Sequence, residues 1–274
     1  MKISFIEPRT ELKAYIKSIW VFESQFGMPL KDMNLAAPNG CPKLIINYEN
    51  NITSFVEGRS SESRECGIYF SGNRDIPVHI STSEKKTGFI GIEFLPYGGY
   101  PILGIPMLET ANHLFTIEEL LGKVGRNLRE VLYNLENTYD KICFIQAKMI
   151  EMICKRNLQS EIVKYCVDTL KITNGLFPIS ELERKTGYSR RYLEMLFKNH
   201  VGFSPKVIAS IFRFQKFYSN WAMGRSYDEF KEELNNYYFD QAHFSKEFKK
   251  MTGFSPLQYT NEVSNEFGRK LTLH

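Results

Sequence analysis

The chain has 274 residues, of which 43% are hydrophobic and 24% are charged, a composition typical of a globular protein and not of a disordered one. The length suggests two domains, and because no apolar run approaches the roughly 20 residues of a membrane span, we expect a cytoplasmic protein without a membrane partner. The net charge is only +4, but residues 1–158 hold 18 basic and 18 acidic side chains, so the whole excess, 17 against 13, lies in residues 159–274. This imbalance is a weak indication that the C-terminal part contacts phosphate groups.

The first 110 residues or so predict a β-rich domain. Short segments at 43–48, 67–70 and 88–95 are rich in β-branched and aromatic residues and are bounded by Gly, Pro, Asn and Ser. Many short strands of this kind indicate a barrel or a sandwich. The spacing of apolar residues predicts a helix over 10–20. From Ile117 to Cys154 the period becomes helical, so we expect a helical appendage that either covers the β-domain or forms a dimer interface.

The sequence shows no pattern typical of an enzyme. His79 and His113 stand 34 residues apart without a His-x-His pair, whereas a metal site needs clustered imidazoles and a carboxylate. No GxSxG nucleophile motif and no glycine-rich phosphate loop occurs. The five cysteines form no CxxC pair, which favours reduced thiols. We therefore expect no catalytic residue, no metal site and no cofactor.

A small-molecule effector is the open question for the β-rich part. Its aromatic residues suffice to line an apolar pocket, although a barrel core without a cavity explains them equally well. Glu93 stands within an apolar strand, where it either anchors a cationic ligand or faces solvent by strand alternation. The candidates for effector binding are Trp20, Tyr48, Glu93, Phe94 and Tyr97.

The polar segment 155–160 predicts a domain boundary, with Ser160 as the N-cap of the next helix. This divides the chain into a β-rich domain with its helical appendage at 1–157, a helical domain at 158–262 and a C-terminal tail at 263–274.

One nine-residue segment of the helical domain is written twice. Residues 197–205 and 248–256, 51 positions apart, share Phe, Lys, Gly, Phe, Ser and Pro in register. This interval predicts a duplicated three-helix unit within one domain. Most of the shared residues have the character of framework: a buried Phe, a terminating Gly and a capping Ser-Pro pair.

The first unit has the signature of a helix-turn-helix. Helices are predicted at 162–172, 179–185 and 190–200, with Gly187 in the turn and Ser189 as the cap of the last helix. The last helix of such a unit enters the major groove of DNA. Arginines at its start suit guanine, a glutamate suits cytosine, and a lysine near its end suits phosphate. The candidates for DNA contact are Arg190, Arg191, Glu194, Met195 and Lys198.

A long helix at 205–222 follows and leads to the second unit. It is apolar on two sides and about 27 Å long, so it is suited to hold two units near the spacing of about 34 Å between successive major grooves. Asp240 is expected to cap a helix at 241–252, in which a glutamine suits adenine and an alanine suits a thymine methyl. The candidates for DNA contact here are Gln241, Ala242, His243, Ser245, Lys246 and Lys249.

Residues 160–262 resemble the DNA-binding domain of AraC/XylS-type transcription regulators. The resemblance rests on the two units, the Ser-Pro pairs after Gly-Phe, the Ile-Phe-Arg-Phe-Gln stretch at 211–215 and residues 238–244. It implies double-stranded DNA as a partner, recognition helices in adjacent major grooves, and regulation of transcription together with RNA polymerase. Regulators of this family usually act as activators and less often as repressors.

The second unit departs from the family pattern. Ten positions separate Phe230 from its cap Asp240, against seven from Leu182 to Ser189, and Tyr237 stands where the family mostly has Gly. The second unit is therefore expected to dock with a different tilt or to contact mainly phosphates.

The N-terminal part resembles the sensing domain of some of these regulators through Pro8, the segments 12–20 and 38–40, and residues 91–98. The resemblance implies a cupin-like β-barrel, and hence an α+β protein with an effector-controlled DNA-binding function. The alternative is that the N-terminal domain serves only for oligomerisation, as in a homodimer, or for partner contact.

Overall fold

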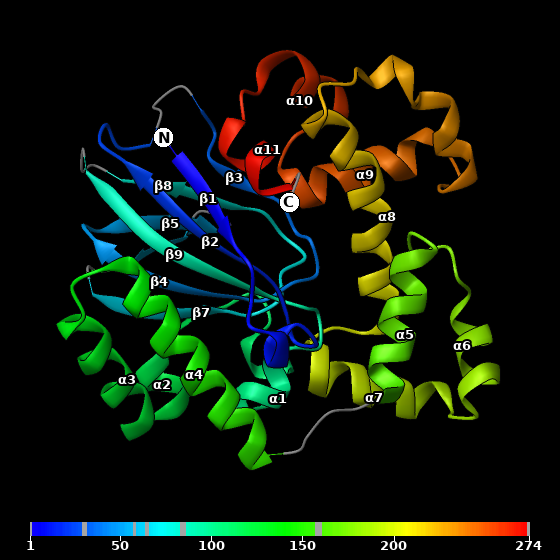
Figure 1. Ribbon diagram of the computed structural model, residues 1–274. Helices are drawn as coiled ribbons and strands as arrows, with labels where there is room; N and C mark the ends of the chain where they lie inside the picture. The colour runs from blue at the N-terminus through cyan, green and yellow to red at the C-terminus, as the bar shows by residue number, and fades with distance from the viewer. Residues whose placement is uncertain are drawn as a thin grey trace.

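The computed structural model describes residues 2–28, 32–56, 59–63, 66–82, 86–156 and 161–272 (Figure 1). Strands fill the N-terminal part, and the C-terminal part is helical (Figure 1). The α+β class expected from the sequence is confirmed.

The strands form two antiparallel sheets. The six-stranded sheet has the order β1 (Lys2–Ile6), β2 (Ile16–Ser24), β9 (Thr87–Phe94), β4 (Lys43–Glu49), β7 (Gly67–Ser71) and β10 (Leu114–Thr116). The four-stranded sheet has the order β3 (Leu35–Ala36), β8 (Val78–Ser81), β5 (Ile52–Val56) and β6 (Arg59–Ser63). Side chains of the two sheets meet in one apolar cluster that includes Trp20, Ile52 and Phe89, so the sheets face each other.

The helix predicted at 10–20 is wrong. A single 3-10 turn, η1 (Thr10–Leu12), is followed by β2, which pairs with β1 on one side and β9 on the other. Apolar residues occur on both faces of β2 because both faces of this inner strand are covered. A strand of this kind has no clean alternation, so its apolar positions can mimic helical spacing.

A layer of helices covers the outer face of the six-stranded sheet (Figure 1). It consists of α1 (Gly99–Leu103), η2 (Met107–Thr110), α2 (Ile117–Leu121), α3 (Lys123–Asn134) and α4 (Thr138–Arg156). Ile90, Ile92 and Phe94 of β9 pack there against residues such as Leu128 and Met149. The predicted helical appendage thus completes the core of the β-domain.

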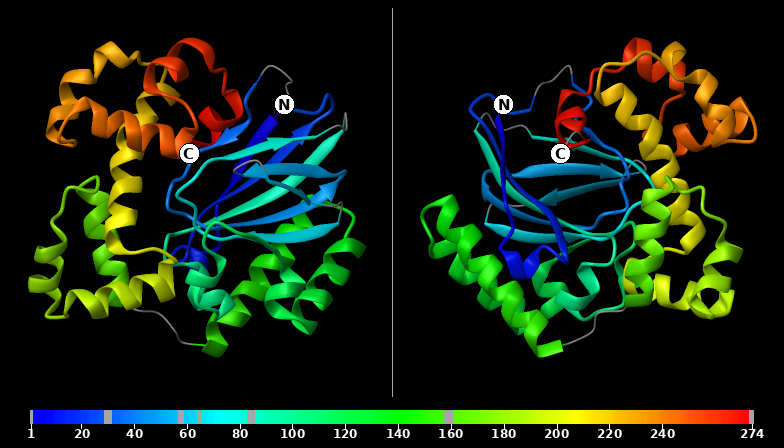
Figure 2. Two further views of the ribbon diagram at one scale, coloured as in Figure 1. Left: turned by 180° about the vertical axis from the view of Figure 1, so that it is seen from behind. Right: turned by 45° about the vertical axis from the view of Figure 1, so that its right-hand side comes forward.

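The C-terminal helices pack around α8 (Pro205–Ala222), which runs between two groups of helices (Figure 2). Before it come α5 (Glu161–Ile172), α6 (Ile179–Thr186) and α7 (Arg190–Val201). After it come η3 (Tyr227–Glu229), η4 (Lys231–Asn236), α9 (Gln241–Thr252), α10 (Pro256–Glu262) and α11 (Glu266–Thr272). One apolar cluster joins both groups to fully buried residues of α8 such as Phe214 and Phe217. The long helix therefore packs against both units, as its two apolar sides predict.

The ends of the predicted domains are only partly visible. Residues 157–160, including the expected cap Ser160, lie outside the described residues, between the end of α4 and the start of α5. The segment expected to be a tail contains α11, which lies against β3 of the N-terminal part (Figure 2).

Candidate nucleic-acid interface and ligand cavity

Apart from Lys198 and Lys249, the residues shared by the two copies of the repeat are structural. Phe197 and Phe248 are fully buried, and Gly202 and Gly253 end α7 and α9 with φ of 92° and 85°, in the left-handed region that favours glycine. The prediction that the repeat is framework is confirmed.

Each repeat also starts the next helix in the same way. Ser204 Oγ accepts a hydrogen bond from Val207 N (3.4 Å), and Ser255 Oγ accepts one from Gln258 N (3.3 Å). A proline follows each serine at the first helical position, where its missing N–H costs nothing. The helices that follow α7 and α9 thus begin with the same local chemistry.

Helix α7 presents its candidate side chains to solvent. Its cap, Ser189, accepts a hydrogen bond from Tyr192 N at 3.4 Å. Arg190 Nε lies 3.1 Å from Glu194 Oε1, and this ion pair holds both side chains along the helix. The other candidates, Arg191, Met195 and Lys198, are exposed, and Glu194 is half-buried.

Sequence reasoning missed an aromatic pair beside this helix. The rings of Tyr188 and Tyr192 stack at 4.9 Å between centroids, and both are exposed. They flank the first turn of α7, where flat apolar rings can lie against deoxyribose. Their four-residue spacing around the cap Ser189 is the signal that could have revealed them.

Helix α9 is built on the same plan. Asp240 Oδ1 accepts a hydrogen bond from His243 N at 2.7 Å, and Gln241 Nε2 donates to Tyr227 Oη at 2.8 Å, which orients its amide at the helix start. The candidates Gln241, Ala242, His243, Lys246 and Lys249 are exposed, and Ser245 is half-buried.

The turn of the second unit differs from that of the first. Gly187 ends α6 with φ of 72°, whereas Tyr237 has φ of −120°, a conformation open to any residue. In place of an α-helix, the 3-10 helices η3 and η4 precede this turn, and Phe230 and Leu234 are buried. Tyr237 therefore replaces the usual glycine without backbone strain.

A polar cluster fixes α9 on α8. Glu247 Oε1 accepts a hydrogen bond from Ser210 Oγ at 2.9 Å and lies 3.7 Å from Arg213 Nη2 and 3.5 Å from His243 Nε2. These contacts help to fix the orientation of α9 on α8.

The C-terminal ends of α7 and α9 are both held by the N-terminal part. Asn73 Nδ2 donates to the carbonyl of Val201 at 2.7 Å, and Lys250 of α9 forms an ion pair with Asp75. The first residues of each helix remain exposed. These are the residues with which a helix-turn-helix reads base edges.

His200, at the end of α7, lies at the same contact between α7 and the N-terminal part, which we call the seam. Its ring contacts that of Tyr100 in α1, with 4.2 Å between centroids and the planes tilted by 37°. Burial lowers the pKa of His200 from its ordinary value of 6.5, so the seam favours the neutral imidazole.

A cavity of about 100 Å³ lies between the two sheets. Its walls are mainly apolar and include Trp20, Ile45, Ile52, Ile80 and Phe89. Trp20 is 2% exposed, and its Nε1 has no hydrogen-bond partner among the described residues. A polar donor in an apolar wall of this kind is costly unless something pairs with it.

A cationic group borders the same cavity. Arg74 donates from Nε to Ser71 Oγ (2.9 Å) and from Nη1 to the carbonyl of Asn112 (3.0 Å). Within the described part of the chain, no carboxylate lies within ion-pair distance of its guanidinium. Burial lowers the pKa of Arg74 to about 10.

Only Trp20, of the five predicted effector residues, lines this cavity. Tyr48 and Phe94 lie on the helix-covered face of the six-stranded sheet, and Tyr97 packs in the core of the C-terminal helices. Strand alternation separates the two faces of a sheet, but it does not tell which face borders a cavity.

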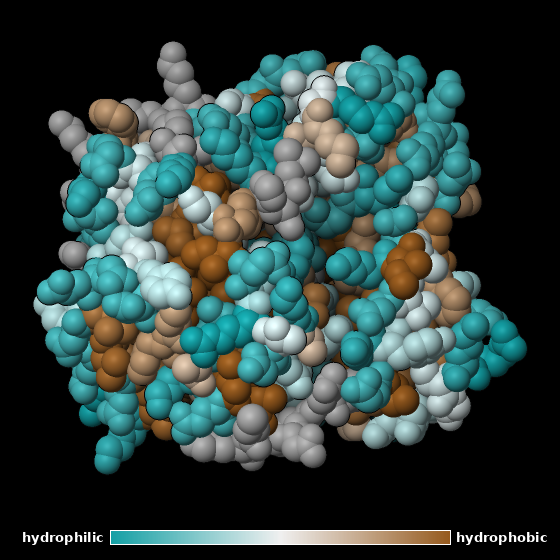
Figure 3. Space-filling model, viewed as in Figure 1, coloured by the Kyte–Doolittle hydropathy of each residue, from teal (hydrophilic) through white to brown (hydrophobic). Residues whose placement is uncertain are grey.

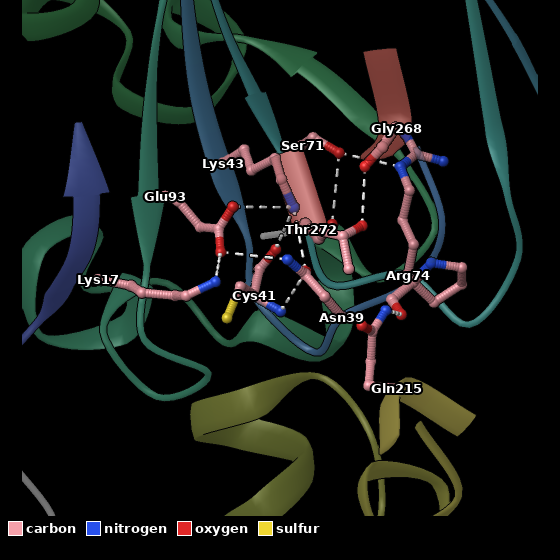
Figure 4. A network of polar contacts seen from close by, with 12 residues as sticks. Lys17, Asn39, Cys41, Lys43, Ser71, Arg74, Glu93, Gln215, Gly268 and Thr272 are labelled. Atoms are coloured by element: carbon pink, nitrogen blue, oxygen red, sulfur yellow. Dashed lines mark hydrogen bonds and ion pairs between the residues drawn. The ribbon is translucent and has the colours of Figure 1, made fainter. Parts of the chain in front are cut away.

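Glu93 is buried, so the expectation that it faces solvent is wrong. It does not line the main cavity but borders a smaller pocket beside it, together with Lys17, Asn39 and Lys43, and its role as an anchor for a cationic ligand stays a prediction. Its carboxylate is 3% exposed and lies 2.7 Å from Lys17 Nζ, 3.1 Å from Asn39 Nδ2 and 3.8 Å from Lys43 Nζ (Figure 4). Burial opposes ionisation, but the two ammonium groups outweigh it and hold the pKa of Glu93 below its usual value. All eight residues of β9 are buried, so alternation offers no face to solvent.

The surface over the second unit, at the upper right of Figure 3, is predominantly hydrophilic.

Among the described residues, no group of three or more His, Cys, Asp or Glu side chains is placed to hold a metal ion. None of the helices described is both long and apolar enough to cross a membrane.

Comparisons with known proteins give one family and several solved structures. A family model described as a domain of unknown function (DUF6597) matches residues 4–116. No curated protein matches the sequence. A structure of ToxT from Vibrio cholerae is similar at 12% identity, covering 91% of this chain and 100% of ToxT with a TM-score of 0.48.

Two further structures are similar over most of their length. ToxT from Vibrio cholerae with an unsaturated fatty acid bound matches at 10% identity, covering 94% of this chain and 98% of that one, with a TM-score of 0.46. The AraC-like transcriptional activator CuxR matches at 13% identity, covering 81% of this chain and 87% of its own, with a TM-score of 0.25.

Proposed function

We propose that this chain is a sequence-specific regulator of transcription that binds double-stranded DNA by inserting α7 and α9 into successive major grooves. One observation carries the proposal: two capped helices, each with its first turn exposed, are joined by one buried helix of 18 residues. At 1.5 Å per residue α8 is about 27 Å long, which suits grooves that recur about every 34 Å.

The two helices are expected to read different bases. In α7, Arg191 has no ion-pair partner among the described residues and is free to contact guanine O6 and N7. In α9, Gln241 and Ala242 offer an amide and a methyl group to an A·T pair. Lys198 and Lys249 stand near the helix ends and serve as phosphate contacts.

The cavity between the sheets supports a small-molecule effector. Its walls are mainly apolar, and its polar features include the ammonium group of Lys43, the guanidinium of Arg74 and Trp20 Nε1, which has no partner among the described residues. This lining suits an apolar molecule with one anionic or hydrogen-bond-accepting group. If no such molecule raises the thermal stability of the protein, and DNA affinity is constant in a stable dimer, the N-terminal part serves only for oligomerisation.

Two matched variants test the roles of the DNA-contacting residues. The full chain first selects its site from random duplexes, and binding is then measured on that site and on unrelated DNA. Arg191→Ala is expected to weaken binding to the selected site by about 1–3 kcal/mol and to leave unrelated DNA nearly unaffected. Lys249→Ala is expected to weaken binding to both and to reduce the salt slope by about 1.

Lys148→Ala, at a partly exposed position of α4, serves as the control of equal charge change and should alter neither affinity. Absence of duplex binding at low salt would contradict the proposal. Equal losses on both duplexes for Arg191→Ala would remove that residue from base recognition.

A further inference from the structure

Helix α11 packs at one end of the space between the two sheets, and we call this end the mouth. Phe267 of α11 is fully buried in a cluster with Trp20, Phe22 and Phe89, and its ring meets that of Phe22 edge-on with 5.9 Å between centroids. Leu271, one helical turn further on, packs against the same cluster. Both side chains form part of the wall of the cavity.

A dedicated set of polar contacts seats this segment. The carboxylate of Asp32 accepts hydrogen bonds from the backbone N–H groups of Glu266 (2.7 Å) and Phe267 (3.1 Å), and from Ser264 Oγ at 3.3 Å. Met33 N donates to the carbonyl of Ser264 at 2.8 Å. Asp32 therefore caps a helix that begins more than 230 residues later in the chain.

Helix α11 also pairs closely with β3. Asn265 accepts from Leu35 N and donates to the carbonyl of Leu35, both at 2.9 Å, so its side chain mimics a strand partner. A Cβ on Gly268 would lie 2.2 Å from the same carbonyl, and only glycine permits this approach. The segment at Asn265 and Gly268 and the backbone of Leu35 are therefore closely complementary in shape and hydrogen bonding.

The same asparagine connects the segment to the second DNA-binding unit. Asn265 Nδ2 lies 3.1 Å from Tyr218 Oη of α8 and 3.0 Å from Tyr259 Oη of α10, and the two phenol oxygens are 2.9 Å apart. All of these groups are buried or partly buried. A shift of α11 must therefore disturb the packing of α8 and α10.

The size of the cavity indicates competition. With α11 in place the cavity measures about 100 Å³, whereas pockets for small molecules commonly measure about 300–1,000 Å³. Phe267 and Leu271 form part of the cavity wall, and their displacement would add the volume of two large apolar side chains to the space.

We propose that residues 264–272 are an internal ligand of the mouth between the sheets, that an apolar anionic molecule competes with them for it, and that their displacement loosens the second DNA-binding unit. The regulatory meaning of this exchange rests on the proposed function, but the exchange itself does not. In this proposal residues 264–272 compete with a ligand for the cavity, and their displacement links ligand binding to the packing of α8 and α10.

Dye binding by the full chain tests the competition. The probe is 1-anilinonaphthalene-8-sulfonate, which combines apolar rings with an anionic group. Phe267→Ala removes the apolar anchor and Asp32→Ala removes the helix cap, so each should tighten dye binding by about tenfold, since the fraction of molecules with an open mouth rises. Leu257→Ala, at an exposed position of α10, is the control and should leave the dye affinity unchanged.

A further substitution shows where the dye binds. Ile80→Trp fills the cavity from β8, so adding it to Phe267→Ala should abolish the gain. Unchanged dye affinity in both Phe267→Ala and Asp32→Ala, each folded by circular dichroism, would overturn the proposal. A gain that survives Ile80→Trp would overturn it as well.

Hydrogen exchange on the unaltered chain supplies a test without mutation. Saturating dye should speed exchange of the amides in residues 264–272, whose Glu266 and Phe267 amides are bonded to Asp32. Equal or slower exchange would overturn the proposal. Because neither readout involves DNA, a failure here is distinct from a failure of duplex binding.

Discussion

The buried carboxylate of Glu93 is balanced by two lysine side chains from the strands on either side of β9. Lys17 comes from β2 and Lys43 from β4, and both ammonium groups lie within 4 Å of the carboxylate. Removing the charge leaves two cations near each other in a partly buried site. Glu93→Gln is therefore expected to lower the free energy of unfolding by about 3 kcal/mol in urea denaturation at neutral pH.

Glu7→Gln, in an exposed ion pair with Lys13, is the matched control and should cost less than about 1 kcal/mol. The pKa of Glu93 lies below its usual value of 4.5 in the folded protein, so its contribution is present above pH 4.5 and is lost as the pH falls through the lowered pKa. The stability difference between wild type and Glu93→Gln should shrink over that range. A constant difference would contradict the ion pair.

His200 gives the seam between α7 and the N-terminal part a second dependence on pH. Its pKa is lowered by burial, so the unfolded chain takes up a proton more readily than the folded one. The contribution of the neutral ring is present above pH 6.5 and is lost as the pH falls through the lowered pKa. Between pH 7.5 and pH 5.5, wild type should therefore lose more stability than His200→Gln, measured by urea unfolding.

His113→Gln, at an exposed position, is the control and should follow the wild-type pH profile. If His200→Gln and wild type lose stability in parallel, the imidazole is not desolvated in the seam.

At the scale of elements, two glycines of the first unit share a conformation but not an environment. Gly175 and Gly187 have φ of 73° and 72°. A Cβ on Gly187 would meet nothing within 4 Å, whereas one on Gly175 would lie 1.9 Å from the carbonyl oxygen of Ala209 in α8. Gly187→Ala should cost about 1 kcal/mol, and Gly175→Ala more than about 3 kcal/mol, in the free energy of unfolding.

Urea denaturation of the two variants measures this difference, and each is the control for the other. Equal costs would mean that α5 and α8 are not packed together at this turn.

Local signals explain which elements could be predicted. The limits of α7, α8 and α9 follow from the sequence because they depend on signals that act within a few residues. These signals are the caps Ser189 and Asp240, the terminating glycines and the Ser-Pro starts. The segment 10–20 could not be read in this way. There the apolar pattern reflects burial of β2 on both faces, which depends on strands far away in the chain.

At the scale of the whole molecule, the contacts that join the two parts link distant residues. Asn73 meets Val201, Gln215 donates to the carbonyl of Pro38, and Asp32 meets Phe267. None of these pairs leaves a local pattern, so the docking of α11 and the position of the cavity could not be predicted. The outward faces of α7 and α9 could be predicted, because helical spacing alone separates them from the core.

We propose that one chain occupies two successive major grooves, and a footprint on DNA gives the sharpest test. The full chain is bound to a site selected from random duplexes and probed by hydroxyl-radical cleavage. We expect two protected segments on one face of the duplex, with centres about 10 base pairs apart, and Gln241→Ala should weaken protection at only one of them. A single protected segment, or no protection at low salt, would contradict the account.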